Sequence, residues 1–267
     1  MTAVAVTIAG SDSSGGAGVQ ADLKTFAALG VHGASVFAAL TAQNTERVTA
    51  IHDVPPDFIA AQIDAVYSDL DIGAAKTGML SQAVAIEAVV KGLVRHKAKN
   101  IVVDPVMVAS TGAQLLADSA VEAIRKVLIP RALVVTPNLP EAALLTGASL
   151  ARNEEEMEVQ AREILSLGAR HVLIKGGHGS GADSVDLLIG QGSVLRLSAP
   201  RTATRNTHGS GCTLSSAIAA GLAKGRDLVA AVQEAKTFVT GAIAAADRLK
   251  IGRGHGPLHH FHDRWDS

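Results

Sequence analysis

The stretch Val4-Ala-Val-Thr-Ile-Ala-Gly10-Ser-Asp-Ser-Ser-Gly-Gly-Ala-Gly18 decides the fold of this chain. It runs from an apolar segment of strand length through a glycine-rich loop into a helical pattern over residues 19–29. The same alternation repeats further along. Beside the first strand at 4–9, we expect strands at 34–40, 101–103, 133–135 and 172–174, and helices at 57–69, 82–95, 120–128 and 154–167. Such alternation predicts an α/β fold of three layers, with a mainly parallel sheet between two layers of helices.

The pattern changes towards the C-terminal end. Residues 185–189 and 194–197, joined by the turn Gln191-Gly192, predict an antiparallel hairpin at the edge of the sheet. Two alanine-rich helices are expected next, at 215–223 and 228–246. Because no linker, low-complexity tract or repeat interrupts the 267 residues, we expect a single domain over residues 1–267.

Composition excludes several classes of protein. A net charge of −1 and 3% aromatic residues argue against a nucleic-acid-binding surface, which needs a concentrated basic face. One cysteine cannot form an internal disulfide, which fits a reducing compartment. Residues 1–10 lack the basic start of a secretory signal, and the uncharged stretch 25–45 contains too many polar residues for a membrane span. We therefore expect a soluble cytoplasmic protein with no membrane and no nucleic-acid partner.

The segment Asn206-Thr-His-Gly209-Ser-Gly-Cys212-Thr-Leu-Ser215 has the features of an anion site. Two glycines bracket a serine just before a helical run, so unpaired backbone N–H groups gather at the positive end of a helix dipole. The only cysteine lies there, and a thiol at a helix N-terminus has a lowered pKa and can act as a base or nucleophile. An anion site beside a proton acceptor is typical of a phosphoryl transferase. The alternative is a glycine-rich helix start with an inert, buried cysteine.

Other polar residues follow the expected strands, where ligands bind in an open parallel sheet. The loop from Gly10 to Gly18 lacks the ending of a P-loop and is as well explained by positive φ angles as by ligand binding. Asp104 and Glu141 could together hold a hydrated Mg²⁺, although Glu141 alone is better explained by the start of its helix. Lys175, followed by two glycines, suits a phosphate contact but is a weak signal by itself.

Taken together, these segments resemble the hydroxymethylpyrimidine/phosphomethylpyrimidine kinases of thiamine biosynthesis, which belong to the ribokinase-like superfamily. The resemblance extends from residue 4 to residue 265. The superfamily usually carries an aspartate base where this chain has Cys212. The motifs that carry the resemblance are Gly10–Asp22, Thr41-Ala-Gln-Asn-Thr45, Lys76-Thr-Gly-Met-Leu80, Val103-Asp-Pro-Val-Met107, Thr136-Pro-Asn-Leu-Pro-Glu141, Lys175-Gly-Gly-His178, Asn206–Ser215 and Gly256-Pro-Leu-His-His-Phe-His262.

The resemblance implies a ribokinase-like kinase that uses ATP and Mg²⁺ to phosphorylate 4-amino-5-hydroxymethyl-2-methylpyrimidine and then its monophosphate. It also implies a role for each matching residue. Cys212 would be the general base, and the N–H groups of Gly209, Ser210, Gly211 and Cys212 would hold the transferring phosphoryl group. The nucleotide would be contacted by Lys175 and Thr207, and Mg²⁺ would be organised by Asp104 and Glu141 with Asn138 nearby. The pyrimidine pocket would be lined by Gly10, Asp22, Gln43, Met79 and Val106.

Three alternatives remain open at this stage. A pyridoxal kinase would share the fold and phosphorylate a similar hydroxymethyl group, although Gln43 and Met79 favour the pyrimidine. A non-catalytic nucleotide or vitamin sensor is disfavoured because base, anion site, lysine and carboxylates are all present. A cysteine hydrolase would need a histidine poised beside Cys212, for which His208 is a weak candidate.

Further expectations concern the assembly and two segments. Relatives in the resembled family are commonly dimers, so a homodimer is expected. The histidine-rich tail at residues 255–262 does not match a structural zinc spacing and is expected to pack against the domain. Small residues at 110–112 suggest a loop that closes over the pyrimidine.

Overall fold

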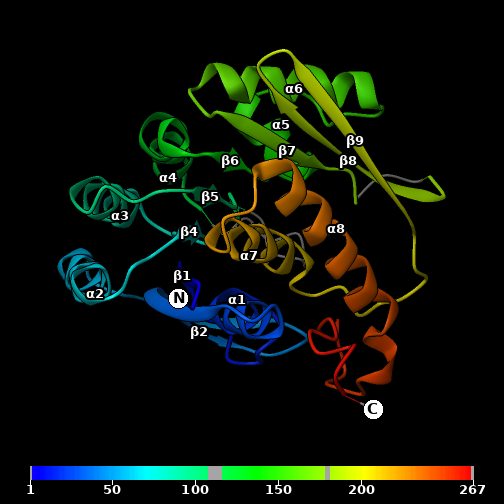
Figure 1. The fold of residues 1–267 in the computed structure, drawn as a ribbon, viewed down its shortest axis with the longest axis horizontal. Coiled ribbons are helices and arrows are strands. Elements are labelled where there is room, and N and C mark those ends of the chain that lie inside the picture. The colour runs from blue at the N-terminus through cyan, green and yellow to red at the C-terminus, as the bar shows by residue number, and fades with distance from the viewer. Residues whose placement is uncertain (1, 108–115, 178–180, 266–267) are drawn as a thin grey trace.

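A computed structural model describes residues 2–107, 116–177 and 181–265. The segment 110–112, and His178 of the lysine–glycine motif, lie outside the described residues. Within the described part the chain forms a nine-stranded sheet in the order β3-β2-β1-β4-β5-β6-β7-β8-β9 (Figure 1). The strands are β1 (Val4–Gly10), β2 (His32–Gln43), β3 (Val48–Asp53), β4 (Ala74–Thr77), β5 (Ile101–Val103), β6 (Val134–Val135), β7 (His171–Lys175), β8 (Asp183–Gly190) and β9 (Ser193–Pro200).

The sheet is parallel in its centre and antiparallel at both edges. Strands β2, β1, β4, β5, β6 and β7 run parallel, whereas β3 pairs antiparallel with β2. At the other edge β8 pairs antiparallel with β7 and β9 with β8, through the register Ile189↔Val194. The mainly parallel sheet and the edge hairpin predicted from the sequence are both confirmed. The second antiparallel edge, formed by β3, was not predicted.

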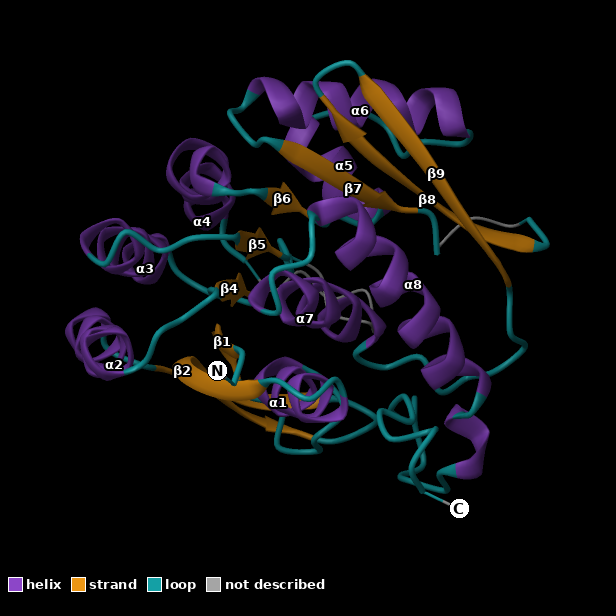
Figure 2. Cartoon of the chain, in the orientation of Figure 1, coloured by secondary structure: helices purple, strands orange, loops and turns teal. Residues whose placement is uncertain are grey.

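Helices cover both faces of the sheet (Figure 2). One layer contains α2 (Pro56–Asp69), α3 (Ala83–Arg95), α4 (Asp118–Ala123) with its π-helical continuation η1 (Ile124–Leu128), α5 (Leu139–Thr146) and α6 (Glu154–Ser166). The other contains α1 (Gly18–Ala28), α7 (Ser210–Ala223) and α8 (Leu228–Ala244). Neighbouring strand residues alternate between the two cores. Val103 packs into the first core and Val102 into the second, as side chains on opposite faces of a strand must.

Helix α7 lies in the middle of its layer, between α1 and α8 (Figure 1). It is buried along nearly its whole length, and small residues such as Gly221 permit this because an added Cβ there would lie 2.9 Å from the Ala231 side chain of α8. The helix begins at Ser210 rather than at residue 215, so the predicted start was five residues too late. This correction makes Gly209 the N-cap and places Ser210, Gly211 and Cys212 in the first helical turn.

One helical segment, Leu228–Arg248, is long and apolar enough to cross a membrane by length and composition alone, which is weak evidence. It contains α8, which lies along α7 in the helical layer. Ala231, Val232 and Ala235 of α8 are buried in the second core. The segment is therefore accounted for as a core helix of the domain.

Candidate active site

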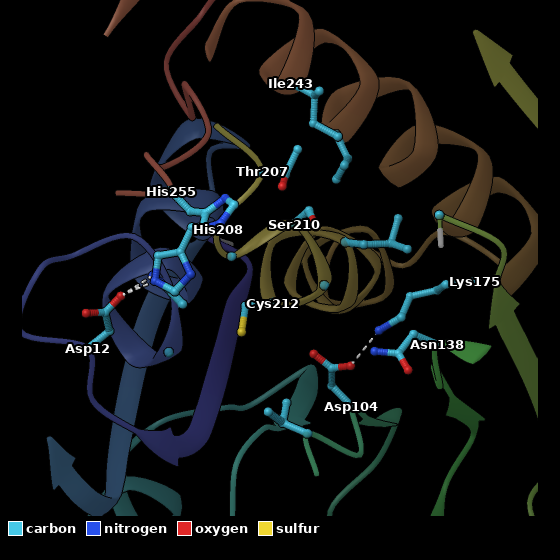
Figure 3. A pocket seen from close by; sticks show the side chains of 18 of the residues that line it. Asp12, Asp104, Asn138, Lys175, Thr207, His208, Ser210, Cys212, Ile243 and His255 are labelled. Atoms are coloured by element: carbon cyan, nitrogen blue, oxygen red, sulfur yellow. Dashed lines mark hydrogen bonds and ion pairs between the residues drawn. The ribbon is translucent and has the colours of Figure 1, made fainter. Parts of the chain in front are cut away.

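The carboxyl ends of the parallel strands and the start of α7 surround one large cavity (Figure 3). Its volume is about 790 Å³, within the range of small-molecule sites. All of the site residues expected above except Asp22 line it. They are Gly10, Gln43, Met79, Asp104, Val106, Asn138, Glu141, Lys175, Thr207, Gly209, Ser210, Gly211 and Cys212.

Asp22 does not line the cavity, so its predicted contact with the pyrimidine is corrected. Its side chain is fully buried in α1 and accepts hydrogen bonds from Thr7 Oγ1 at 2.5 Å and Ser216 Oγ at 2.7 Å. It also forms an ion pair with Lys76, whose Nζ lies 2.8 Å and 3.0 Å from the two carboxylate oxygens. With these partners Asp22 lies behind the cavity wall and holds Lys76, which does line the cavity.

The first turn of α7 is shaped by Gly209. This residue has φ +84°, and a Cβ built on it would lie 1.9 Å from the carbonyl oxygen of Gly16. The first intrahelical bond runs from the N–H of Thr213 to the carbonyl of Gly209 at 2.8 Å, so the preceding N–H groups lie at the open helix end. Among them, Ser210 N–H donates to the Thr207 carbonyl at 3.2 Å. The turn thus has the open helix start at which anions commonly bind, with one donor already engaged within the turn.

Cys212 points its sulfur into the cavity from this turn (Figure 3). Burial raises the pKa of its thiol to about 11, although the positive charge of Lys76 and the backbone N–H of Gly18 act in the opposite direction. The lowered pKa expected from the helix N-terminus is therefore wrong for the ligand-free protein. Desolvation of the thiolate outweighs the favourable charges around it.

A buried cluster of charges lies across the cavity from the cysteine. Lys175 Nζ is 3.0 Å from Asp104 Oδ1 and 3.9 Å from Glu141 Oε2. Asp104 further accepts hydrogen bonds from Thr136 and Ser215, at 3.1 Å each. Although burial opposes its ionisation, Lys175 and Lys76 hold the Asp104 pKa below its usual value. Burial raises the Glu141 pKa to about 7, despite the attraction of Lys175.

The Glu141 side chain both caps the start of its helix and faces the cavity. It forms a capping box with Asn138 at the start of α5, where Asn138 Oδ1 accepts from Glu141 N–H at 2.9 Å and Glu141 Oε2 accepts from Asn138 N–H at 2.8 Å. It also lines the cavity. The cap fixes the carboxylate in place beside Lys175, so a structural role and a role in the site do not exclude each other.

A contact between Asp12 and His208 at the opposite wall was not predicted from the sequence. Asp12 closes the glycine-rich loop by accepting hydrogen bonds from the N–H groups of Ser14, Gly16 and Ala17. Its Oδ2 lies 2.8 Å from His208 Nε2, which in turn is 3.4 Å from Gln43 Nε2. This chain of contacts joins the loop after β1, the end of β2 and the start of α7 around Gln43.

The loop after Lys175 is held by two further groups that no sequence signal indicated. Asp186 of β8 accepts from Gly176 N–H at 3.0 Å and pairs with Lys236 Nζ at 2.7 Å. Arg201 donates to the carbonyls of Gly176 and Gly177 at 3.0 Å and 2.6 Å. These contacts position the loop that begins with the proposed phosphate lysine.

Comparison with known proteins decides the family. A family model described as phosphomethylpyrimidine kinase matches residues 12–259. The chain belongs to the phosphomethylpyrimidine kinase family. A hydroxymethylpyrimidine/phosphomethylpyrimidine kinase from Rhizobium meliloti is 58% identical over 265 residues, covering 99% of both chains. The resemblance seen in the sequence is thereby confirmed.

Solved structures agree with this family and with the ribokinase-like fold. The ADP complex of Bacillus subtilis pyridoxal kinase superposes with a TM-score of 0.92 at 36% identity and covers 100% of both chains. Phosphomethylpyrimidine kinase from Clostridium difficile 630 gives a TM-score of 0.80 at 44% identity, covering 90% of this chain and 99% of that one. Phosphomethylpyrimidine kinases and pyridoxal kinases therefore share this fold, so the fold does not distinguish between their acceptor substrates.

Proposed function

We propose that this protein is an ATP-dependent kinase that phosphorylates the hydroxymethyl group of 4-amino-5-hydroxymethyl-2-methylpyrimidine and then phosphorylates the monophosphate to the diphosphate. The observation that carries this proposal is the position of Cys212. It is a potential base within the first turn of α7, whose N–H groups can bind an anion, and it shares one cavity with Gln43, Lys175 and the two carboxylates. A proton acceptor and an anion site are both needed at an acceptor hydroxyl.

In the mechanism that this geometry supports, the Cys212 thiolate accepts the proton of the hydroxymethyl group. The hydroxyl oxygen forms the new bond to the γ-phosphorus of ATP, and the bond from that phosphorus to the bridging oxygen breaks, so ADP leaves. The N–H groups of Gly209, Gly211 and Cys212 stabilise the charge on the phosphoryl oxygens because they lie at the positive end of α7. The N–H of Ser210 joins them once it leaves the Thr207 carbonyl. The second phosphorylation uses the same site with a phosphate oxygen as the acceptor.

The nucleotide and metal are assigned to the far side of the cavity. Lys175 and Thr207 contact the phosphates of ATP. Asp104 and Glu141 would hold hydrated Mg²⁺, with Asn138 nearby, and the ion would neutralise phosphate charge. The residues fit this ion because the two buried carboxylates lie together beside Lys175 at the cavity wall. Mg²⁺ typically uses one or two carboxylates together with waters and phosphate oxygens.

The pyrimidine is assigned to the wall formed by Gly10, Gln43, Met79 and Val106. Gln43 offers an amide that can pair with a ring nitrogen or the amino group, and its position is limited by Thr41 and His208. Gly10 leaves room for Met79, since a Cβ on this glycine would lie 2.5 Å from the Met79 methyl carbon. A polar edge and an apolar wall suit a flat aminopyrimidine.

The direct test of two successive phosphorylations is ³¹P NMR of a reaction that starts from the unphosphorylated pyrimidine, ATP and Mg²⁺. We expect a monoester signal that rises and then gives way to the two signals of a diphosphate. A reaction that stops at the monoester would contradict the second step. Incubation of the isolated monoester with fresh ATP serves as the control for substrate exhaustion.

The pH dependence of the Mg²⁺ requirement tests the assignment of Glu141. Its pKa of about 7 lies above the usual value, so the carboxylate gains a proton as the pH falls through 7 and loses affinity for a cation. We expect the apparent KM for Mg²⁺ to increase about tenfold between pH 8 and pH 6. Glu141→Gln is the matched control because it keeps the shape without the titration. An equal pH dependence in that variant would remove Glu141 from the metal site.

A pyridoxal kinase is the second candidate, favoured by the close superposition on the Bacillus subtilis enzyme. It would use the same base, anion site and lysine, and would differ only in the ring held by Gln43 and Met79. A non-catalytic sensor is the weaker alternative, because nothing in its task would require a base beside the anion site.

We further propose that the protein is a cytoplasmic homodimer. Near the β3 edge its surface carries the exposed apolar side chains Leu40 and Phe58. Light scattering coupled to gel filtration will give the mass in solution. A mass of twice 27.3 kDa is expected, and a monomer at micromolar concentration would contradict the dimer.

A further inference from the structure

The buried ion pair between Lys76 and Asp22 has no place in the reaction described so far. Both side chains are completely inaccessible to solvent, and Lys76 lies on the central strand β4. Burying two charges is costly, and a pair of apolar residues of similar volume is often at least as stable. Fold stability alone is therefore a weak reason for a lysine at this position, which suggests a task for its charge.

Through Ser216, the contacts of Asp22 connect the ion pair to the helix that carries Cys212. One Asp22 oxygen, Oδ1, accepts from both Lys76 Nζ and Ser216 Oγ. Ser216 is on α7 four residues after Cys212, so the two side chains lie on the same face of that helix, one turn apart. The ion pair and the sulfur therefore lie against the same face of α7. Lys76 and Cys212 also line the same cavity.

The orientation of the pair matters for the sulfur. At Cys212 the positive charge of Lys76 acts more strongly than the negative charge of Asp22, and the charge of Asp104 is weaker still. Lys175, at the end of β7, adds a further positive charge that interacts with this sulfur. At the thiol, the attraction of the ammonium group is therefore stronger than the repulsion from the carboxylate that holds it. Asp104 is engaged instead by Thr136, Lys175 and Ser215.

We propose that Lys76 is a positioning residue for phosphoryl transfer, whose ammonium group, held by Asp22, stabilises the thiolate form of Cys212. This inference rests on the proposed function, because it assumes that Cys212 is the base. The thiolate takes the hydroxyl proton during transfer and becomes a neutral thiol, which returns that proton to solvent before the next cycle. Lys76 keeps its own proton throughout: burial disfavours its charge, but Asp22, Cys212 and Asp104 together more than compensate and raise its pKa.

The chain offers a clean probe of this effect because Cys212 is its only cysteine. Alkylation by iodoacetamide therefore reports on this sulfur alone, and its rate follows the thiolate fraction. We compare the ligand-free wild type with Lys76→Met/Asp22→Asn, in which both charges are removed and no buried charge is left unpaired. At pH 8 we expect alkylation of the double variant to be about tenfold slower, with the midpoint of the rate-against-pH curve moved to higher pH.

Two further variants separate the effect of the Lys76 charge on alkylation from an effect on folding. Lys76→Met alone leaves the Asp22 charge near the sulfur, so its alkylation should be at least as slow as in the double variant. Val89→Ala, in the core on the other face of the sheet, lowers stability without removing a charge and should keep the wild-type pH curve. Thermal unfolding of each variant checks that the protein compared is folded.

Equal alkylation rates and equal pH midpoints in the wild type and in the folded double variant would overturn the role of Lys76. The assignment of Cys212 as the base is tested by a separate result. If Cys212→Ala kept full kinase turnover, Cys212 would not be the base, whereas the alkylation result would still report the coupling of Lys76 to the sulfur. If both proposals hold, kcat of the double variant also falls and the acid limb of its pH profile moves to higher pH.

Discussion

Replacing Cys212 by alanine is expected to lower kcat for both phosphorylations by about 10²- to 10⁴-fold, the usual contribution of a general base. Alanine keeps the backbone N–H groups of the first turn of α7, so the phosphoryl site remains. Binding of ATP should therefore change little. Steady-state ADP release gives kcat, and calorimetric titration with a non-hydrolysable ATP analogue gives the nucleotide affinity.

The informative control for this variant is Cys212→Asp. Aspartate is the base that the ribokinase-like superfamily usually carries at this position, so it should recover at least about tenfold of the activity lost in the alanine variant. Wild-type turnover in Cys212→Ala would contradict the base assignment. Loss of ATP binding in that variant would instead indicate that the side chain shapes the anion site.

Replacing Gly209 by alanine is expected to abolish most activity and to destabilise the protein. The residue has φ +84°, which is strained for any residue with a Cβ, and the new Cβ would lie 1.9 Å from the Gly16 carbonyl oxygen. Relief of that clash must move the start of α7, which carries the proposed anion site, away from the glycine-rich loop. We expect kcat/KM for ATP to fall about 100-fold or more, because a misplacement of about 1 Å has that cost.

The matched control is Gly225→Ala just after the other end of the same helix. Gly225 has φ +81°, but a Cβ there meets nothing within 4 Å. This variant has only the backbone strain of about 1–2 kcal/mol, which lowers Tm by a few degrees and leaves kcat/KM near the wild-type value. Similar activity of the two variants would show that the contact with Gly16 does not position the anion site.

Strand and helix patterns predicted the central layers well because their buried faces are made of continuous apolar runs such as 4–9 and 101–103. Two strands were missed for physical reasons. β4 is only four residues long and contains Lys76, a charge that is buried because Asp22 neutralises it. β3 is an exposed edge strand with almost no buried residue, so it has no hydrophobic run to detect.

Which residues line the cavity was largely predictable, because most of them follow strands that end at one edge of the sheet. The sequence does not show which side chains are buried, or which residues far apart in the chain pair with each other. Asp22 was assigned to the ligand but is committed to Thr7, Lys76 and Ser216, at separations of 15, 54 and 194 residues. The acidity of Cys212 was misjudged for the same reason, since the helix position is visible in the sequence and desolvation is not.

The acceptor of the kinase can be determined by measuring kcat/KM for three substrates under one set of conditions with ATP and Mg²⁺: the hydroxymethylpyrimidine, its monophosphate and pyridoxal. We predict turnover of both pyrimidines and a kcat/KM for pyridoxal at least about tenfold lower, the discrimination that a few well-placed contacts provide. A preference for pyridoxal would contradict the assignment of the Gln43 and Met79 wall to a pyrimidine and would make the protein a vitamin B6 kinase. No turnover with any of the three acceptors would contradict the kinase itself.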